Sequence, residues 1–370
     1  MSRDTPGRQL AATLIQRIAQ QGPLSVADYM ALALTDPECG YYMCRDPLGA
    51  RGDFVTAPEV SQMFGELVGL WCADAWRRLG EPAEVLLVEL GPGRGTLMAD
   101  ALRAARTLPA FDEALKVHLV EISPALRARQ AETLASEGPQ WHDDLAGLPE
   151  GPLLLIANEF FDALPMRQLV KTATGWCERQ VTLADGPEDA PPAFAFGLSA
   201  PRPDAEQLVP AVLRDAPAGT IFETSPSAAR TAAEIGRRLA AHGGAAVIID
   251  YGHSESATGD TLQAVRGHAR HDVLADPGSA DLTCHVDFAA LARAAREVGA
   301  EAHGPIGQGA WLRRLGIEAR AAALMERATP AQQKDIRSAL ARLTGAEEMG
   351  DLFKVLALVP SDFGLPAGFV

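Results

Sequence analysis

Three glycines, each separated by one residue, form the part of this sequence best suited to ligand chemistry: Gly91, Gly93 and Gly95. They follow the apolar run Val85–Leu90 and precede residues 97–108, in which apolar side chains recur at helical spacing. This order predicts a buried parallel strand, a tight turn and the N-terminus of a helix. Close backbone approach at glycine and the N–H groups of the helix start make a pocket of nucleotide size.

The residues around the turn narrow the cofactor class. A dinucleotide fingerprint requires glycine where this chain has Thr96, and no Gly-Lys-Ser/Thr sequence follows to make a phosphate-binding loop. The Glu-x-Gly-x-Gly-x-Gly pattern beginning at Glu89 instead resembles the first motif of S-adenosylmethionine-dependent methyltransferases. A carboxylate there offsets the positive charge of the cofactor's sulfonium and ammonium groups. The alternative is a structural strand-turn-helix without ligand.

Two further acidic residues suit an adenosine. Glu121 ends the second predicted strand, where a carboxylate can accept hydrogen bonds from both ribose hydroxyls. Asp143 follows the third predicted strand, and we assign it to the adenine amino group. The alternatives are a surface carboxylate at a strand end and a solvated acidic turn.

A third polar cluster follows the apolar run Leu153–Asn158. Asn158 and Glu159 are expected at the carboxyl edge of the sheet, beside the cofactor's methyl group, with Asp162 close behind in sequence. Ligands of parallel α/β sheets bind outside that edge, so polar side chains there are candidates for catalysis. Phe160 and Phe161 could contact the cofactor, although filling the core is the simpler interpretation.

The elements that would position these residues alternate between strands and helices from residue 85 onward. We predict strands at 85–90, 116–121, 140–142, 153–158, 245–251 and, as a returning edge strand, 352–359, with helices at 95–107, 124–136 and 227–242. Such alternation predicts a doubly wound, mostly parallel sheet. Residues 1–80 read as a helical cap region with helices at 7–20, after Ser25 and at 61–79. Residues 81–370 read as the methyltransferase domain, with an insertion around 165–220 that contains a β-hairpin (166–170 and 176–183) and a Pro-rich irregular segment (187–203).

Composition excludes several functional classes. The formal charge is −15, from 33 basic and 48 acidic residues, which argues against a nucleic-acid binder and suits a basic substrate surface. The five cysteines are scattered without a Cys-x-x-Cys pair, which predicts neither a zinc site nor a disulfide framework. No apolar run is long enough to span a bilayer, and the polar first residues carry no export signal. We therefore expect a cytoplasmic protein without metal; the oligomeric state is left open.

Several longer blocks resemble the MidA family. They are residues 52–66 (GDFVTAPEVSQMFGE), 89–95 (ELGPGRG), 158–165 (NEFFDALP), 249–253 (IDYGH), 278–288 (GSADLTCHVDF) and 308–312 (QGAWL). The resemblance implies a class I methyltransferase fold and S-adenosylmethionine as cofactor. Because mitochondrial proteins of similar pattern symmetrically dimethylate an arginine on a peripheral-arm subunit of respiratory complex I, it also implies protein arginine methylation that aids assembly of that complex.

An arginine substrate demands carboxylates, because a guanidinium is charged and effectively never deprotonated in water. With this substrate implied by the resemblance, we assign Glu159 and Asp162 to catalysis with Asn158 orienting. The substrate-binding candidates are Asp53, Glu59, Glu223, Tyr251 and His253. Buried cap or turn carboxylates, and a hydrogen-bonded loop histidine, are the competing interpretations.

Two other functions stay open at this point. The same fold could act on a different protein or on a small molecule. Alternatively, the protein could be an assembly chaperone that binds the cofactor without turnover.

Overall fold

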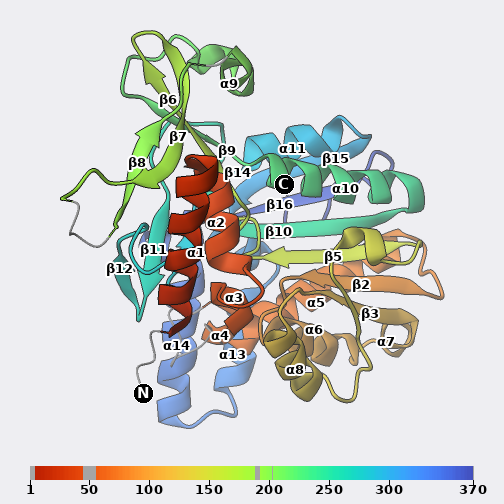
Figure 1. Cartoon of the computed structure of the whole chain (residues 1–370). Coiled ribbons are helices and arrows are strands. Elements are labelled where there is room, and N and C mark those ends of the chain that lie inside the picture. The colour runs from red at the N-terminus through yellow and green to blue at the C-terminus, as the bar shows by residue number, and fades with distance from the viewer. Residues whose placement is uncertain (1–4, 45–55, 188–191, 202, 370) are drawn as a thin grey trace. The chain divides into compact units, whose positions relative to one another are not determined.

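The computed structural model describes residues 5–44, 56–187, 192–201 and 203–369 (Figure 1). The chain forms two compact units, and each draws on separate stretches of sequence. Unit 1 comprises Met1–Phe54, Asp162–Ala228 and Glu255–Asp287; unit 2 comprises Val55–Phe161, Ala229–Ser254 and Phe288–Val370. This grouping by contacts is distinct from the linear division at residue 80, which stays a prediction.

Unit 2 is built on a twisted sheet with helices on both faces. Its strands are β2 (Val85–Leu90), β3 (Leu115–Val120), β4 (Gln140–His142), β5 (Leu153–Asn158), β10 (Gly244–His253), β15 (Ala300–Gly307) and β16 (Phe353–Pro360). Its helices are α4 (Ala57–Val60), α5 (Gln62–Arg78), α6 (Thr96–Ala105), α7 (Pro109–Ala114), α8 (Pro124–Thr133), η1 (Leu145–Gly147), α10 (Pro226–His242), α11 (Phe288–Arg296), α12 (Gln308–Arg314), α13 (Ile317–Met325), α14 (Pro330–Thr344) and the π-turn η3 (Ala346–Gly350).

The strand order of unit 2 is β15-β16-β10-β5-β2-β3-β4. The five strands from β10 to β4 run parallel, whereas β16 is antiparallel to both β10 and β15. The order reverses direction between β2 and β5, which is the point where parallel α/β sheets bind ligands. The predicted doubly wound, mostly parallel sheet is therefore confirmed.

The central strands are continuous apolar runs because both faces of the sheet are covered. One face packs against α5, α6 and the C-terminal helices in a single apolar cluster that includes Leu87, Ile156 and Val247. Figure 1 shows α10 and α11 on the other side of β5 and β10 from α5 and α6. The helix α10 carries buried apolar side chains, among them Ile235 and Leu239. Every core strand predicted from these runs is present within two residues.

Several strands were missed in the sequence, including five short ones at 24–25, 263–266, 269–271, 281–283 and 286–287. The segment 352–359, predicted as the edge strand, forms β16. It is not at the edge, because β15 pairs with its outer side and is itself the edge strand. β15 contains two glycines and a proline, so it lacks the apolar run that marked its neighbours. The segment 187–203 was predicted as irregular, but it contains β8 (Phe194–Leu198), which pairs with β7.

Unit 1 combines helices with two small sheets. Its helices are α1 (Thr5–Gln21), α2 (Val26–Thr35), α3 (Tyr41–Cys44), α9 (Pro203–Leu208) and the 3-10 turn η2 (Ala211–Leu213). Its strands are β1 (Leu24–Ser25), β6 (Arg167–Thr172), β7 (Gly175–Leu183), β8, β9 (Ile221–Thr224), β11 (Gln263–Arg266), β12 (Ala269–His271), β13 (Asp281–Thr283) and β14 (Val286–Asp287). The predicted hairpin is confirmed as β6 and β7, and Ser25 caps α2 by accepting from Asp28 N.

No helix in the described part of the chain is long and apolar enough to cross a membrane.

Candidate cofactor and methyl-transfer site

The glycine turn leaves β2 in a conformation that favours glycine. Gly91, Gly93 and Gly95 have φ of +58°, +55° and +81°, and Gly95 is the N-cap of α6. A Cβ atom added to Gly91 would lie 3.0 Å from Cδ2 of Phe160. Positive φ and this close approach explain why the turn uses glycine. Phe160 contacts the turn at Gly91. Phe161 is buried in the core, as the core-filling interpretation predicted.

Glu89 lies within the sheet just before the turn, with only 3% of its surface exposed. Its carboxyl accepts a hydrogen bond from the main chain of Met98 in the first turn of α6. Its Oε2 atom has no hydrogen-bond partner among the described residues. Burial raises the pKa of Glu89 to about 8, against a smaller opposing effect of the Met98 hydrogen bond. An unpartnered buried carboxyl oxygen fits a site that a cationic ligand completes.

Glu121 lies at the end of β3 and is tied to the glycine turn through a glutamine. Its carboxylate accepts from Ser123 N at 2.8 Å and from Gln130 Nε2 at 3.1 Å. Gln130 Nε2 also donates to the Gly93 carbonyl at 2.8 Å, and the Gln130 side chain is fully buried. Burial raises the pKa of Glu121, and these hydrogen bonds oppose the shift.

Gln130 therefore sets the spacing between the turn and Glu121, a role that sequence reasoning missed. A glutamine on a helix gives no local signal of a buried bridge. Asp143, predicted to bind adenine, has its Oδ1 2.6 Å from an Arg127 guanidinium nitrogen. The side chain of Asp143 is 85% exposed, so this pair is weak and a ligand could replace it.

Asn158 and Glu159 end β5 next to β2, as the sequence predicted, with Leu90 paired to Ala157 in parallel register. Glu159 has φ +50°, a left-handed conformation that costs a non-glycine residue about 1 kcal/mol. Its Oε1 atom accepts from Asn158 Nδ2 at 3.1 Å and from Ala57 N at 3.0 Å. Asn158 is 8% exposed, and its Oδ1 has no hydrogen-bond partner among the described residues.

Asp250 on β10 supports this strand end; the sequence placed Asp250 at the end of a strand but did not indicate these hydrogen bonds. It is fully buried, and its carboxylate accepts from Phe161 N at 3.0 Å and from Tyr251 N at 2.9 Å. The Glu159 N–H donates to the Ile249 carbonyl at 2.8 Å. The two strand ends are thereby joined. Tyr251 packs edge-on against Phe353.

Three more residues were predicted to bind substrate. His253 is the last residue of β10 and is half-buried. Glu59 belongs to α4, where its Oε1 accepts from the Thr96 hydroxyl at 2.6 Å. Asp53 lies outside the described residues.

Asp162 and Glu223 belong to unit 1. Asp162 is buried, and its carbonyl accepts from Cys284 N at 3.0 Å. The Glu223 carboxylate accepts from Gln168 Nε2 at 2.7 Å and from both the N–H and the hydroxyl of Thr261. These three hydrogen bonds hold the Glu223 carboxylate within its own unit, and its binding of substrate stays a prediction.

The residues of unit 2 fit the expected cofactor. S-adenosylmethionine combines a sulfonium and an ammonium with an adenosine, so it needs close backbone approach, buried acceptors and a partner for its ribose. The glycine turn allows the close backbone approach. Glu89 Oε2 and Asn158 Oδ1 are buried acceptors that lack donors among the described residues, and Glu121 lies one strand away from the turn. Within the described ranges no cluster of three or more His, Cys, Asp or Glu side chains could hold a metal ion.

Comparison with known proteins gives four consistent likenesses, three of sequence and one of structure. The model of the family described as S-adenosyl-L-methionine-dependent methyltransferases matches residues 67–306. The chain is 38% identical to protein arginine methyltransferase NDUFAF7, mitochondrial, of Xenopus tropicalis, over 96% of this chain and 87% of that protein. It is 39% identical to the Drosophila melanogaster homolog, over 95% and 85%.

A solved structure is similar over the whole chain. A protein from Burkholderia thailandensis bound to S-adenosyl-homocysteine superposes with a TM-score of 0.86 at 31% identity, covering 100% of this chain and 97% of that one.

The expected cytoplasmic location is contradicted by these relatives, because the curated ones are named as mitochondrial proteins. That expectation rested on polar first residues and scattered cysteines. Neither feature distinguishes one reducing compartment from another, and we do not retain it.

Proposed function

We propose that this chain, which belongs to the family of S-adenosyl-L-methionine-dependent methyltransferases, methylates arginine side chains of a protein. Family membership confirms the sequence predictions of a methyltransferase and of S-adenosylmethionine as its cofactor. The choice of arginine is supported by the names of the relatives, which are protein arginine methyltransferases.

The observation that carries the proposal is the geometry of Glu159. It places a carboxylate at the carboxyl end of β5, beside the glycine turn, in a left-handed backbone conformation. Two donors, Ala57 N and Asn158 Nδ2, hold the same oxygen of that carboxylate. A costly conformation that its surroundings enforce is typical of a functional residue.

When bound, S-adenosylmethionine would supply a methyl group: the substrate nitrogen bonds to it in line as the methyl–sulfur bond breaks, S-adenosyl-homocysteine leaves, and the proton of that nitrogen passes to the Glu159 carboxylate. Catalysis of such a transfer is mainly a matter of position. Glu159 accepts N–H bonds from the substrate guanidinium and draws positive charge toward the nitrogens it contacts, which leaves electron density on the nitrogen that attacks. Asn158 orients Glu159 by its Nδ2 donor. Asp162 remains a second candidate carboxylate.

We assign the cofactor to the edge formed by β2 and β3. The glycine turn (Gly91, Gly93, Gly95) receives the methionine part, with Glu89 near its positive charge. Glu121 accepts from the ribose hydroxyls, and Asp143 is available to the adenine amino group. Tyr251 and His253, at the end of β10, are proposed to line the substrate entrance.

For the substrate protein we propose a subunit of respiratory complex I, with methylation aiding assembly of that complex. The likeness of the sequence blocks to the MidA family supports this finer proposal. The formal charge of −15 suits a basic segment around the target arginine.

Mass spectrometry of complex I tests both levels of the proposal. Subunits from cells with and without this protein are compared for dimethylated arginine, and cells that carry Glu159→Gln serve as the matched control. We expect one or more dimethylarginines that disappear in the deletion and in Glu159→Gln cells. Methylarginine in another protein would replace the complex I assignment, and label found only in small molecules would contradict arginine methylation. Normal assembly in cells with the Glu159→Gln variant, despite lost methylation, would favour a chaperone.

A further inference from the structure

The short helix α4 contacts two elements of the proposed site. At its start, Ala57 N donates to Oε1 of Glu159 at 3.0 Å. Two residues later, Glu59 accepts at 2.6 Å from the hydroxyl of Thr96, the first residue of α6 after the glycine turn. One turn of helix therefore bonds both to the carboxylate assigned to catalysis and to the helix whose N-terminus closes the cofactor turn.

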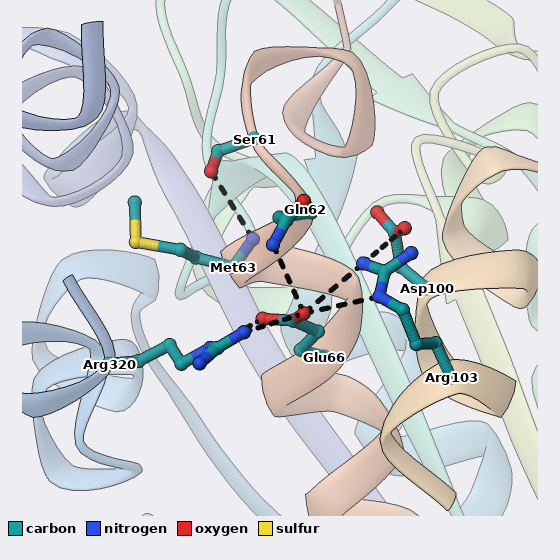
Figure 2. Close-up of polar contacts among 7 residues, drawn as sticks. All are labelled: Ser61, Gln62, Met63, Glu66, Asp100, Arg103 and Arg320. Carbon is teal, nitrogen blue, oxygen red and sulfur yellow. Dashed lines mark hydrogen bonds and ion pairs between the residues drawn. The ribbon is translucent and has the colours of Figure 1, made fainter. Parts of the chain in front are cut away.

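The chain after α4 leads directly into α5. Ser61 ends α4 and caps α5, and its hydroxyl accepts from Met63 N at 3.2 Å (Figure 2). No loop separates the two helices. A movement of α4 relative to α5 therefore requires a change at this single residue.

The start of α5 is in turn fixed on α6. A Cβ atom at Gly65 would lie 2.6 Å from Cβ of Asp100, so the two helices approach closely at a point where only glycine fits. Figure 2 shows Glu66 of α5 between two guanidinium groups, at 3.2 Å from Arg103 of α6 and 2.7 Å from Arg320 of α13. The Glu66 side chain is 8% exposed, which strengthens these ion pairs relative to surface pairs.

We propose that α4 is a clasp that fixes the Glu159 carboxylate relative to the glycine turn, with Glu59 and Thr96 as its positioning residues. The other donor to Glu159 Oε1, Asn158, is the preceding residue and moves with it. Ala57 belongs to a different element, so its N–H sets the direction of the carboxylate relative to α6. This inference rests on the proposed role of Glu159, and it assigns Glu59 to positioning instead of substrate contact.

The consequence for catalysis follows from how strongly methyl transfer depends on position. A displacement of about 1 Å in a reacting group can lower the rate roughly 100-fold. Loss of the Glu59–Thr96 hydrogen bond loosens α4 from α6 and leaves the glycine turn and Glu159 in place. The effect is therefore expected on kcat and not on cofactor affinity.

The test uses the full-length protein and two single variants, Glu59→Ala and Thr96→Val, together with the double variant. Thr96→Ser keeps the hydroxyl and is the conservative rescue. Thr107→Val is the matched control, because the Thr107 hydroxyl bonds only locally, to the Ala104 carbonyl at the other end of α6, at 2.7 Å. The substrate is the peripheral arm of complex I from cells that lack this protein.

For each variant we measure hydrogen–deuterium exchange of the α4 amides, the Kd for S-adenosyl-homocysteine, and kcat. Both single variants are expected to raise α4 exchange about 10-fold and lower kcat about 10- to 100-fold. The Kd is expected to change less than about 3-fold. The double variant is expected to show the same exchange and kcat as either single variant, because each substitution removes the same hydrogen bond. Thr96→Ser and Thr107→Val are expected to behave as wild type.

Unchanged exchange in Glu59→Ala and Thr96→Val would overturn the clasp. Faster exchange with normal kcat would overturn the positioning role of α4. An equal effect of Thr107→Val would mean that the variants act only by lowering the stability of α6. If the wild-type protein methylates no arginine, the proposed function fails, and the exchange measurement alone then decides whether the clasp exists.

Discussion

Removing the charge at Glu89 should change how the stability of the protein depends on pH. The folded protein raises the pKa of this carboxyl from 4.5 to about 8, because the side chain is 3% exposed and one oxygen lacks a partner among the described residues. A raised pKa means that the folded state binds the proton more tightly than the unfolded chain does. Its stabilising effect is present below pH 4.5 and is lost as the pH rises toward 8.

The size of the effect follows from the shift. Each pKa unit corresponds to about 1.4 kcal/mol, so stability is expected to fall by about 3 kcal/mol between pH 4.5 and 7, and by about 5 kcal/mol in total as an upper bound. Glu89→Gln keeps the shape and the acceptor for Met98 N but cannot ionise. Its stability relative to wild type should therefore increase steadily across this range.

Urea-induced unfolding of both proteins without cofactor, at pH 5, 6, 7, 8 and 9, measures the difference. Other titrating groups contribute equally to both profiles and cancel. Saturating S-adenosyl-homocysteine should reduce the difference, because we place its ammonium near the ionised carboxylate. Wild-type and Glu89→Gln profiles that stay parallel within about 0.5 kcal/mol would refute the reasoning.

Three further predictions concern the same unit. Gly91→Ala forces a side chain into φ +58° and within 3.0 Å of Phe160, so calorimetry should find binding of S-adenosyl-homocysteine weakened by about 10-fold or more; normal affinity would contradict a role of this turn in the cofactor site. Glu66→Ala leaves two half-exposed arginines without their shared carboxylate, and urea unfolding should show a loss of about 2 kcal/mol, whereas a loss below about 0.5 kcal/mol would mean that the cluster adds little. Burial lowers the pKa of His118 to about 4, with a smaller effect of the neighbouring imidazole, so stability should fall as the pH drops from 6.5 toward 4. His118→Gln should reduce this loss of stability at acid pH. An unchanged loss would contradict the attribution of the loss to His118.

The parts of the structure that could be predicted are those with a local physical signature. β2 and β5 are runs buried on both faces, and the glycine turn requires positive φ, so sequence alone located them together with Glu89 and Glu159. β15 carries glycine and proline and gave no such pattern.

The contacts that organise the site could not be predicted, because they join residues far apart in the chain. Nothing near Glu59 indicates that Thr96 will donate to it, and nothing near Gln130 indicates a bridge between Glu121 and Gly93. Such pairs depend on how helices cross, for example at Gly65, and helix crossing has no short-range pattern.

Transfer of a labelled methyl group in vitro tests the central claim most directly. Purified protein is incubated with deuterated-methyl S-adenosylmethionine and the peripheral arm of complex I from cells that lack this protein, and the products are sequenced by tandem mass spectrometry. We predict labelled dimethylarginine with the wild-type protein and none with Glu159→Gln, although that variant still binds S-adenosyl-homocysteine. Undiminished labelling by Glu159→Gln, or no labelled arginine with the wild-type protein, would contradict the account.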